Sequence, residues 1–151
     1  MKIERSKNPG LFFSSKEKGR IVRAVQNAEK NTSGEIRVHL ERKAKEDILA
    51  HACREFDRLG MNKTAERNGV LIFMGVHSKR FAIWADQGIN DKVPANFWKD
   101  IVQAMERAFA EDRFADGIEG AILTIGEKLR AYFPYQREDI NELPDEISYS
   151  F

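Results

Sequence analysis

Hydrophobic residues recur along this chain with two different periods, and the changes of period predict its secondary structure. Near the N-terminus they return every three or four positions, which predicts a helix over residues 15–30 that begins at a capping box formed by Ser14 and Glu17. Over residues 35–41 they alternate with polar residues, which is typical of a half-buried strand. A second helical face over residues 46–59 completes the order helix, strand, helix.

The middle of the chain carries two strand-like stretches close together. Residues 70–74 are continuously apolar, which predicts a central strand covered on both faces. A short polar break at 77–79 separates them from another apolar stretch at 81–85, so we expect an antiparallel hairpin. Because a helix connects the strand at 35–41 to the one at 70–74, these two strands should run parallel in a right-handed crossover.

Two further helices and an acidic segment complete the pattern. A proline suited to a first turn begins a predicted helix over 94–109, and Asp116 with Glu119 forms a second capping box for a helix that ends before Pro134. Residues 136–151 are acidic and contain interleaved apolar positions, so they are predicted to form an extended tail that is solvated or lies across the domain.

These elements predict an α/β fold of one domain. The expected architecture is a three-layer α/β/α sandwich, in which a small mixed sheet combines the crossover with an antiparallel hairpin strand and carries helices on both faces. A length of 151 residues with 42% hydrophobic residues suits a single domain with a real core. We assign residues 1–135 to this domain and residues 136–151 to the acidic C-terminal tail.

The charge balance excludes some classes of partner. The chain carries 25 Lys and Arg against 24 Asp and Glu, a formal net charge of +1, and has no basic stripe with interleaved aromatic residues, so nucleic acid is not an expected partner. It has no apolar run near the ~20 residues of a spanning helix and no signal-like N-terminus, so we expect a soluble, cytoplasmic protein without a membrane anchor. The mixed charge gives no reason to require assembly, and we expect a monomer.

Three polar segments lie at the ends of predicted strands. They are residues 32–35, residues 67–69 and residues 86–89. With the predicted strand directions, the start of the first strand, the start of the second and the end of the third share one rim of the sheet. This rim is therefore the candidate functional site.

An ordered set of motifs identifies a resemblance. The residues that carry it are Glu29-Lys30-Asn31-Thr32-Ser33-Gly34-Glu35-Ile36-Arg37-Val38, Arg67-Asn68-Gly69-Val70-Leu71-Ile72, Asp86-Gln87-Gly88-Ile89 and Phe133-Pro134. Together they resemble the TPM domain family, which includes a plant thylakoid-lumen acid phosphatase, a photosystem repair factor and a nematode receptor modulator. This chain is most similar to the soluble bacterial branch. The resemblance implies a three-layer α/β/α sandwich, divalent-cation binding for some members, commonly of calcium, and a metal-associated carboxylate site for the phosphatase.

With this resemblance, the rim residues become candidate ligands of calcium or another divalent cation. Calcium prefers six to eight oxygen ligands, and the candidates that could supply them are Asp86, Asn90, Asp91, Glu35 and Asn68. The spacing is not that of an EF-hand, because Gly88 and Phe97 stand where oxygen ligands belong. In the alternative interpretation Asp86 and Asn90 cap a turn in which Gly88 supplies a positive φ.

Arg67 and Ser33 are the other polar candidates at the rim. Arg67 could anchor an anion such as phosphate in bidentate fashion, or simply pair with Glu35. Ser33 has no histidine that the predicted topology places at this rim, which disfavours a Ser-His-Asp arrangement. No nucleotide-binding loop or zinc-protease motif is present in the sequence.

Two functional hypotheses follow. In the first, the protein is a calcium-binding module that acts through an unknown protein partner, with Asp86 and Asp91 as leading ligands. In the second, it is a weak acid phosphatase, in which a bound metal polarises the phosphate, Arg67 holds the anion and Asp86 orients water. We favour the first because no convincing base or nucleophile can be assigned; no catalytic residue is predicted.

Overall fold

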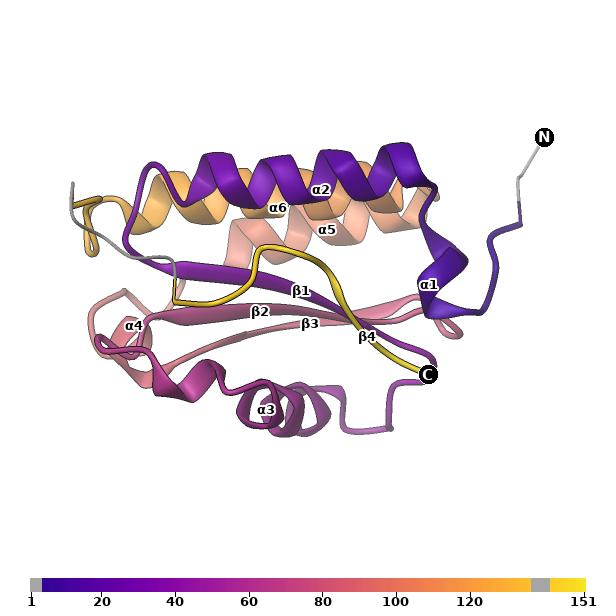
Figure 1. Ribbon diagram of the computed structural model, residues 1–151, viewed down its shortest axis with the longest axis horizontal. Helices are drawn as coiled ribbons and strands as arrows, with labels where there is room; N and C mark the ends of the chain where they lie inside the picture. Colours follow the sequence, from indigo (N-terminus) through magenta and orange to yellow (C-terminus); the bar gives the residue numbers. More distant parts are fainter. Residues whose placement is uncertain (1–3, 137–141) are drawn as a thin grey trace.

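A mixed four-stranded sheet lies between two layers of helices (Figure 1). The computed structural model describes residues 4–136 and 142–151. The strands are β1 (Glu35–Glu41), β2 (Gly69–Gly75), β3 (Arg80–Ala85) and β4 (Ser148–Ser150), in the order β3-β2-β1-β4. The predicted three-layer α/β architecture is confirmed.

Helices cover both faces of this sheet. One face carries α2, α5 and α6, and the other carries α3 (Figure 1). The helices are α1 (Pro9–Phe12), α2 (Ser15–Ala28), α3 (Ile48–Arg58), the 3-10 turn η1 (Met61–Lys63), α4 (Gln87–Asn90), α5 (Lys99–Ala110) and α6 (Phe114–Leu129). The short α1, η1 and α4 were not predicted from the sequence, because segments of three or four residues have no periodicity to detect.

The strand pairing follows the predicted crossover and hairpin. β1 and β2 are parallel from Glu35 opposite Gly69 to Glu41 opposite Gly75. β3 returns antiparallel to β2, with Ala85 opposite Val70. Every residue of β2 is buried, which explains its continuous apolar sequence.

β4 is the strand that the sequence did not predict. It pairs in parallel with the outer edge of β1, with Ser148 opposite His39, so the end of the chain belongs to the sheet. Ile147, just before β4, is 8% exposed and packs in the larger of the two hydrophobic cores. This agrees with the expectation that the tail, with its interleaved apolar positions, could lie across the domain. Residues 137–141 of the predicted tail, with Glu138 and Asp139, lie outside the described residues.

Two predicted helix starts were wrong. α5 begins at Lys99, because Pro94 starts a turn that closes with a hydrogen bond from the Phe97 N–H to the Pro94 carbonyl at 3.0 Å. α6 begins at Phe114 without a side-chain cap. Asp116 and Glu119 do not form a capping box but pair with Arg20 on α2, at 2.6 and 2.8 Å.

The predicted capping box of the first long helix is confirmed. The Glu17 N–H donates to Ser14 Oγ at 3.1 Å, and the Ser14 N–H donates to Glu17 Oε1 at 3.0 Å. Arg5 adds two bonds to the same carboxylate, both at 2.8 Å. The Arg5 hydrogen bond is the main cause that holds the pKa of Glu17 below its ordinary value of 4.5.

Replacing Glu17 by glutamine should lower the free energy of unfolding in a pH-dependent way. Because the folded-state pKa is depressed, the carboxylate contributes its full stabilisation above its ordinary pKa and loses it as the pH falls through the folded value. We expect a deficit of about 1 kcal/mol at neutral pH that shrinks below pH ~4. Urea unfolding of wild type and variant at neutral pH and below pH ~4 measures this deficit. Glu127→Gln, at an exposed position, is the control. An equal deficit at both pH values would contradict the prediction.

Candidate functional site

The three polar segments meet at one rim of the sheet, as the topology predicted. The Glu35 N–H donates to the Asn68 carbonyl at 3.1 Å, and the Asn68 side-chain amide donates to the Ser33 carbonyl at 3.2 Å. On the other side of β2, the Asp86 N–H donates to the Gly69 carbonyl at 2.9 Å. The rim therefore gathers Ser33, Glu35, Asn68 and Asp86 from segments far apart in the sequence.

An aromatic side chain lies between two of the predicted ligands. Glu35 and Asp86 flank Gly69 on the α3 face of the sheet. Phe56 of α3 fills the space above this glycine, because a Cβ there would lie 3.2 Å from Phe56 Cζ. Glu35 and Asp86 consequently have different partners, and the rim divides into two polar groups.

The first group is built on Asp86 and Arg67. The Arg67 guanidinium donates two hydrogen bonds of 2.8 Å to the two carboxylate oxygens of Asp86, and the Gln87 N–H donates to Asp86 Oδ1 at 2.7 Å. Arg67 has a φ of 52°, which turns its side chain back over the rim. The alternative in which Arg67 pairs with Glu35 was wrong, since Arg67 pairs with Asp86 instead.

The remaining predicted loop ligands lie around α4. The Asn90 side chain donates from Nδ2 to the Ala85 carbonyl at 3.0 Å. Asn90 and Asp91 are both exposed. Gly88 does not supply a positive φ; among the glycines of the described residues only Gly60 does. Gly88 is needed for a close approach, because a Cβ would lie 2.2 Å from the Glu66 carbonyl oxygen. Asp86 does cap the turn, as the alternative interpretation predicted.

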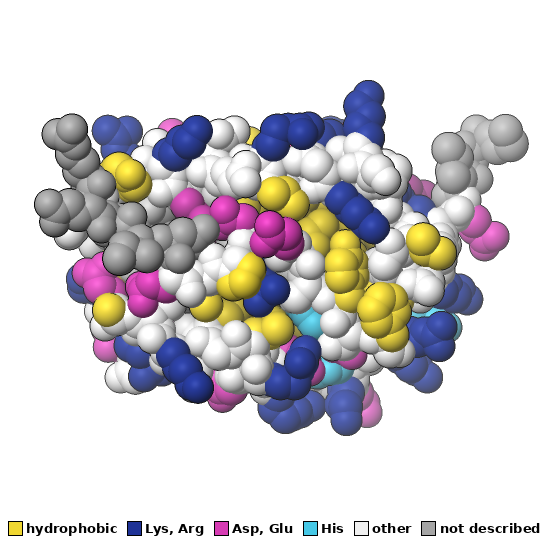
Figure 2. Space-filling view, in the orientation of Figure 1, with side chains coloured by type: hydrophobic (Ala, Val, Ile, Leu, Met, Phe, Trp, Pro, Cys, Tyr) yellow, Lys and Arg dark blue, Asp and Glu magenta, His cyan; other side chains and the backbone are white. Residues whose placement is uncertain are grey.

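The second group consists of carboxylates at the start of β1, beside the segment that leads into β4. Glu35 is 3% exposed, and its Oε1 accepts a bond of 2.7 Å from the Glu142 N–H. Glu29, which follows α2, accepts from the Ile36 N–H at 3.0 Å and lies within hydrogen-bonding reach of the Glu35 and Asp145 carboxyl groups. Figure 2 shows acidic side chains gathered on this face, between α2 and the C-terminal segment.

Burial shapes the electrostatics of this carboxylate group. It is the main cause that raises the pKa of both Glu29 and Glu35, and the hydrogen bond to Asp145 raises the pKa of Glu29 further. Glu35 Oε2 is buried with no hydrogen-bond partner among the described residues, as are Asn68 Oδ1 and Asn62 Oδ1. Two carboxyl groups in contact need a proton or a cation between them.

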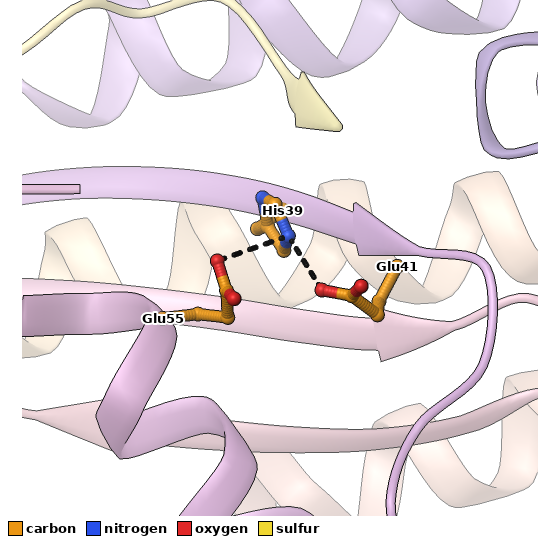
Figure 3. Close-up of side chains that lie close together, drawn as sticks. All are labelled: His39, Glu41 and Glu55. Carbon is orange, nitrogen blue, oxygen red and sulfur yellow. Dashed lines mark hydrogen bonds and ion pairs between the residues drawn. The ribbon is translucent and has the colours of Figure 1, made fainter. Parts of the chain in front are cut away.

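A third polar group lies on the α3 face of the sheet, away from the rim (Figure 3). His39 Nε2 is 3.1 Å from Glu41 Oε1 and 3.7 Å from Glu55 Oε2. The sequence reasoning missed this group, although its signal was present. His39 and Glu41 alternate onto one face of β1, and His51 and Glu55 are four residues apart on α3.

Ser33 has no catalytic partner in the described part of the chain. Its Oγ donates to Glu66 Oε2 at 3.1 Å, and both buried histidines lie along the α3 face with the third group. A Ser-His-Asp arrangement is absent from residues 4–136 and 142–151, in agreement with the topology argument.

Comparison with known proteins places this fold in a family. The family model of the TPM domain matches residues 8–128. The chain belongs to the TPM domain family. The NMR structure of the BA42 protein from the psychrophilic bacterium Bizionia argentinensis is 42% identical, with a TM-score of 0.87 over 92% of this chain and 96% of that one.

More distant structures share the fold of this TPM domain. The N-terminal domain of a protein from P. gingivalis is 16% identical with a TM-score of 0.62, over 83% of this chain and 82% of that one. The N-terminal domain of the cg2496 protein from Corynebacterium glutamicum is 10% identical with a TM-score of 0.58, over 89% and 79%. No curated protein matches the chain. Within the described ranges, none of the helices has the length and apolar character to cross a membrane.

Proposed function

We propose that this TPM domain is a divalent-cation-binding module, with calcium as the expected ion, and that its site is the carboxylate group around Glu35. The observation that carries the proposal is the buried Oε2 of Glu35, which has no hydrogen-bond partner among the described residues, in a side chain whose carboxyl lies within hydrogen-bonding reach of Glu29. A divalent cation would supply the positive charge that these acids lack.

The chemistry of the group favours a hard cation. Glu29, Glu35 and Asp145 offer carboxylate oxygens from three separate segments, and calcium takes oxygen ligands in flexible geometry. Asp86 is a weaker candidate ligand, because both of its oxygens already accept from Arg67. For the same reason the phosphatase hypothesis, which assigns the anion to Arg67, has less support.

The position of this site suggests how an ion could act on a partner. Glu29 and Glu35 belong to the core, whereas Glu142 and Asp145 belong to the C-terminal segment that leads into β4. A cation bound by both parts would hold the segment against β1. We propose that a protein partner binds the surface that this segment forms.

A calcium titration with two variants tests the proposal. We expect the wild-type chain to bind calcium in isothermal titration calorimetry, with amide NMR shifts around residues 29, 35 and 145. Glu35→Gln should weaken binding at least tenfold, about 1.4 kcal/mol, because it removes a charged ligand. Asp91→Asn is the matched control, since it removes a carboxylate of the originally predicted loop, and should leave binding unchanged.

Three outcomes would contradict the proposal. The first is no calcium binding by the wild-type chain. The second is loss of binding in Asp91→Asn but not in Glu35→Gln, which would place the ion at the loop of α4. The third is metal-dependent turnover of a chromogenic phosphate ester that Asp86→Asn abolishes, which would favour the phosphatase.

A further inference from the structure

The His39, Glu41 and Glu55 group combines a nitrogen ligand with two carboxylates in a protected place (Figure 3). His39 is fully buried, and the glutamate side chains are 15% and 13% exposed. We propose that these three residues form a second metal site, distinct from the carboxylate group at Glu35, and that it takes a borderline transition-metal ion, zinc in the first place.

The spacing of the ligand atoms suits such an ion. Zinc binds histidine nitrogen and carboxylate oxygen at about 2.0–2.2 Å, so two ligand atoms of a tetrahedral site lie roughly 3.3–3.6 Å apart. The distances from His39 Nε2 to the Glu41 and Glu55 oxygens, 3.1 and 3.7 Å, bracket this range. The ligand atoms of all three residues lie within 4.8 Å of one another. Small side-chain rotations would bring them to one ion.

β4 supplies the partner that orients the imidazole. His39 Nδ1 is 2.7 Å from Ser148 Oγ, and this hydroxyl can donate in turn to the Val38 carbonyl at 3.4 Å. Without an ion, Nε2–H donates to Glu41 Oε1 at 3.1 Å, because a carboxylate can only accept. An ion that replaced this proton would leave Nδ1 protonated and donating to Ser148 Oγ, with the lone pair of Nε2 free to bind the ion. A hydrogen bond from the outer nitrogen of a histidine is the usual support of a metal ligand.

The residues around the group have supporting roles. The Lys45 N–H donates to His51 Nδ1 at 3.0 Å, so the neutral His51 ring carries its proton on Nε2, 3.7 Å from Glu41 Oε1. Because Nδ1 is occupied and Nε2 carries the proton, His51 is not counted among the ligands. Arg58 donates to Glu55 Oε2 at 2.6 Å, which offsets one negative charge and leaves further lone pairs on that carboxylate.

The donor set separates this site from a calcium site. Imidazole nitrogen favours zinc and its neighbours over calcium, which selects oxygen ligands. With three protein ligands, a fourth tetrahedral position remains for water or for a ligand of another molecule. The inference does not rest on calcium binding at Glu35, and either can fail alone.

Zinc titration of the intact chain tests this site. Calorimetry should show one zinc bound per chain, and imidazole NMR should show the His39 Nε2 resonance shifting as zinc is added. His39→Gln should weaken binding at least tenfold, whereas His77→Gln, which removes an exposed histidine of the hairpin turn, should not. Excess calcium should not displace the zinc, and Glu35→Gln should leave zinc binding intact.

A second variant separates loss of zinc binding from loss of the fold. Glu55 is partly exposed, so Glu55→Gln should keep the native NMR spectrum and still weaken zinc binding. An unchanged His39 Nε2 resonance at saturating zinc would overturn the proposal. So would equal affinity in wild type and Glu55→Gln, or loss of binding in His77→Gln.

Discussion

Replacing Phe73 by alanine is expected to lower the free energy of unfolding by about 3–5 kcal/mol, the largest effect that we predict. Phe73 lies in the middle of β2 and is fully buried. Its ring packs against the imidazoles of His39 and His51, with centroids 5.8 and 4.8 Å apart. Truncation would leave a cavity beneath α3 that the sheet cannot close, because β2 is held by strands on both sides.

Urea unfolding followed by circular dichroism measures this loss. Leu123→Ala is a suitable control, because Leu123 is 41% exposed on α6 and its truncation should change stability by no more than ~0.5 kcal/mol. A deficit below ~1 kcal/mol for Phe73→Ala would mean that α3 collapses onto the sheet, contrary to the expectation of a persistent cavity.

Gly88→Ala should destabilise the protein although it places a better helix former in α4. The new Cβ would lie 2.2 Å from the Glu66 carbonyl oxygen and 2.6 Å from that of Arg67. Both are backbone atoms, so the loop before β2 must shift, and overpacking of this kind costs about 1–3 kcal/mol. Because the same loop aims Arg67 at Asp86, their bidentate pair should loosen as well.

Gly120→Ala provides the matched comparison. Gly120 is also helical, but a Cβ there meets nothing within 4 Å. The substitution should therefore stabilise the protein by about 0.5–1 kcal/mol, the usual gain in helix propensity. Thermal unfolding of both variants, with amide shifts at Arg67 and Asp86, measures the contrast. Stabilisation by both substitutions would contradict the prediction, because it would mean that the loop before β2 shifts without a loss of stability.

The helices and strands that could be predicted are those with a long periodic pattern. The capping box of Ser14 and Glu17, the apolar β2 and the hairpin to β3 follow from local chemistry, and the structure has them. The failures come where a local signal is ambiguous. Asp116 and Glu119 have capping-box spacing, but Arg20 on another helix takes both carboxylates.

The candidate site could be predicted only in part. Strand directions were enough to bring Glu35, Asn68 and Asp86 to one rim. They could not show that Phe56 lies above Gly69 or that Arg67 turns back to Asp86, because both depend on how α3 and the loop pack. The metal roles of the predicted rim residues stay predictions.

The amino-acid sequence by itself determined the α/β class, the central place of β2 and the rim where polar segments meet, because periodicity and crossover handedness act locally or through simple topology. Only the tertiary structure decided which polar groups face one another. Glu29 lies beside Glu35 and Asp145, and His39 lies beside Glu55. Their spacing in the sequence does not predict these contacts. The physical reason is that β4 pairs with the outer edge of β1 and α3 covers its polar face, so polar side chains in an alternating pattern become buried and must find partners there.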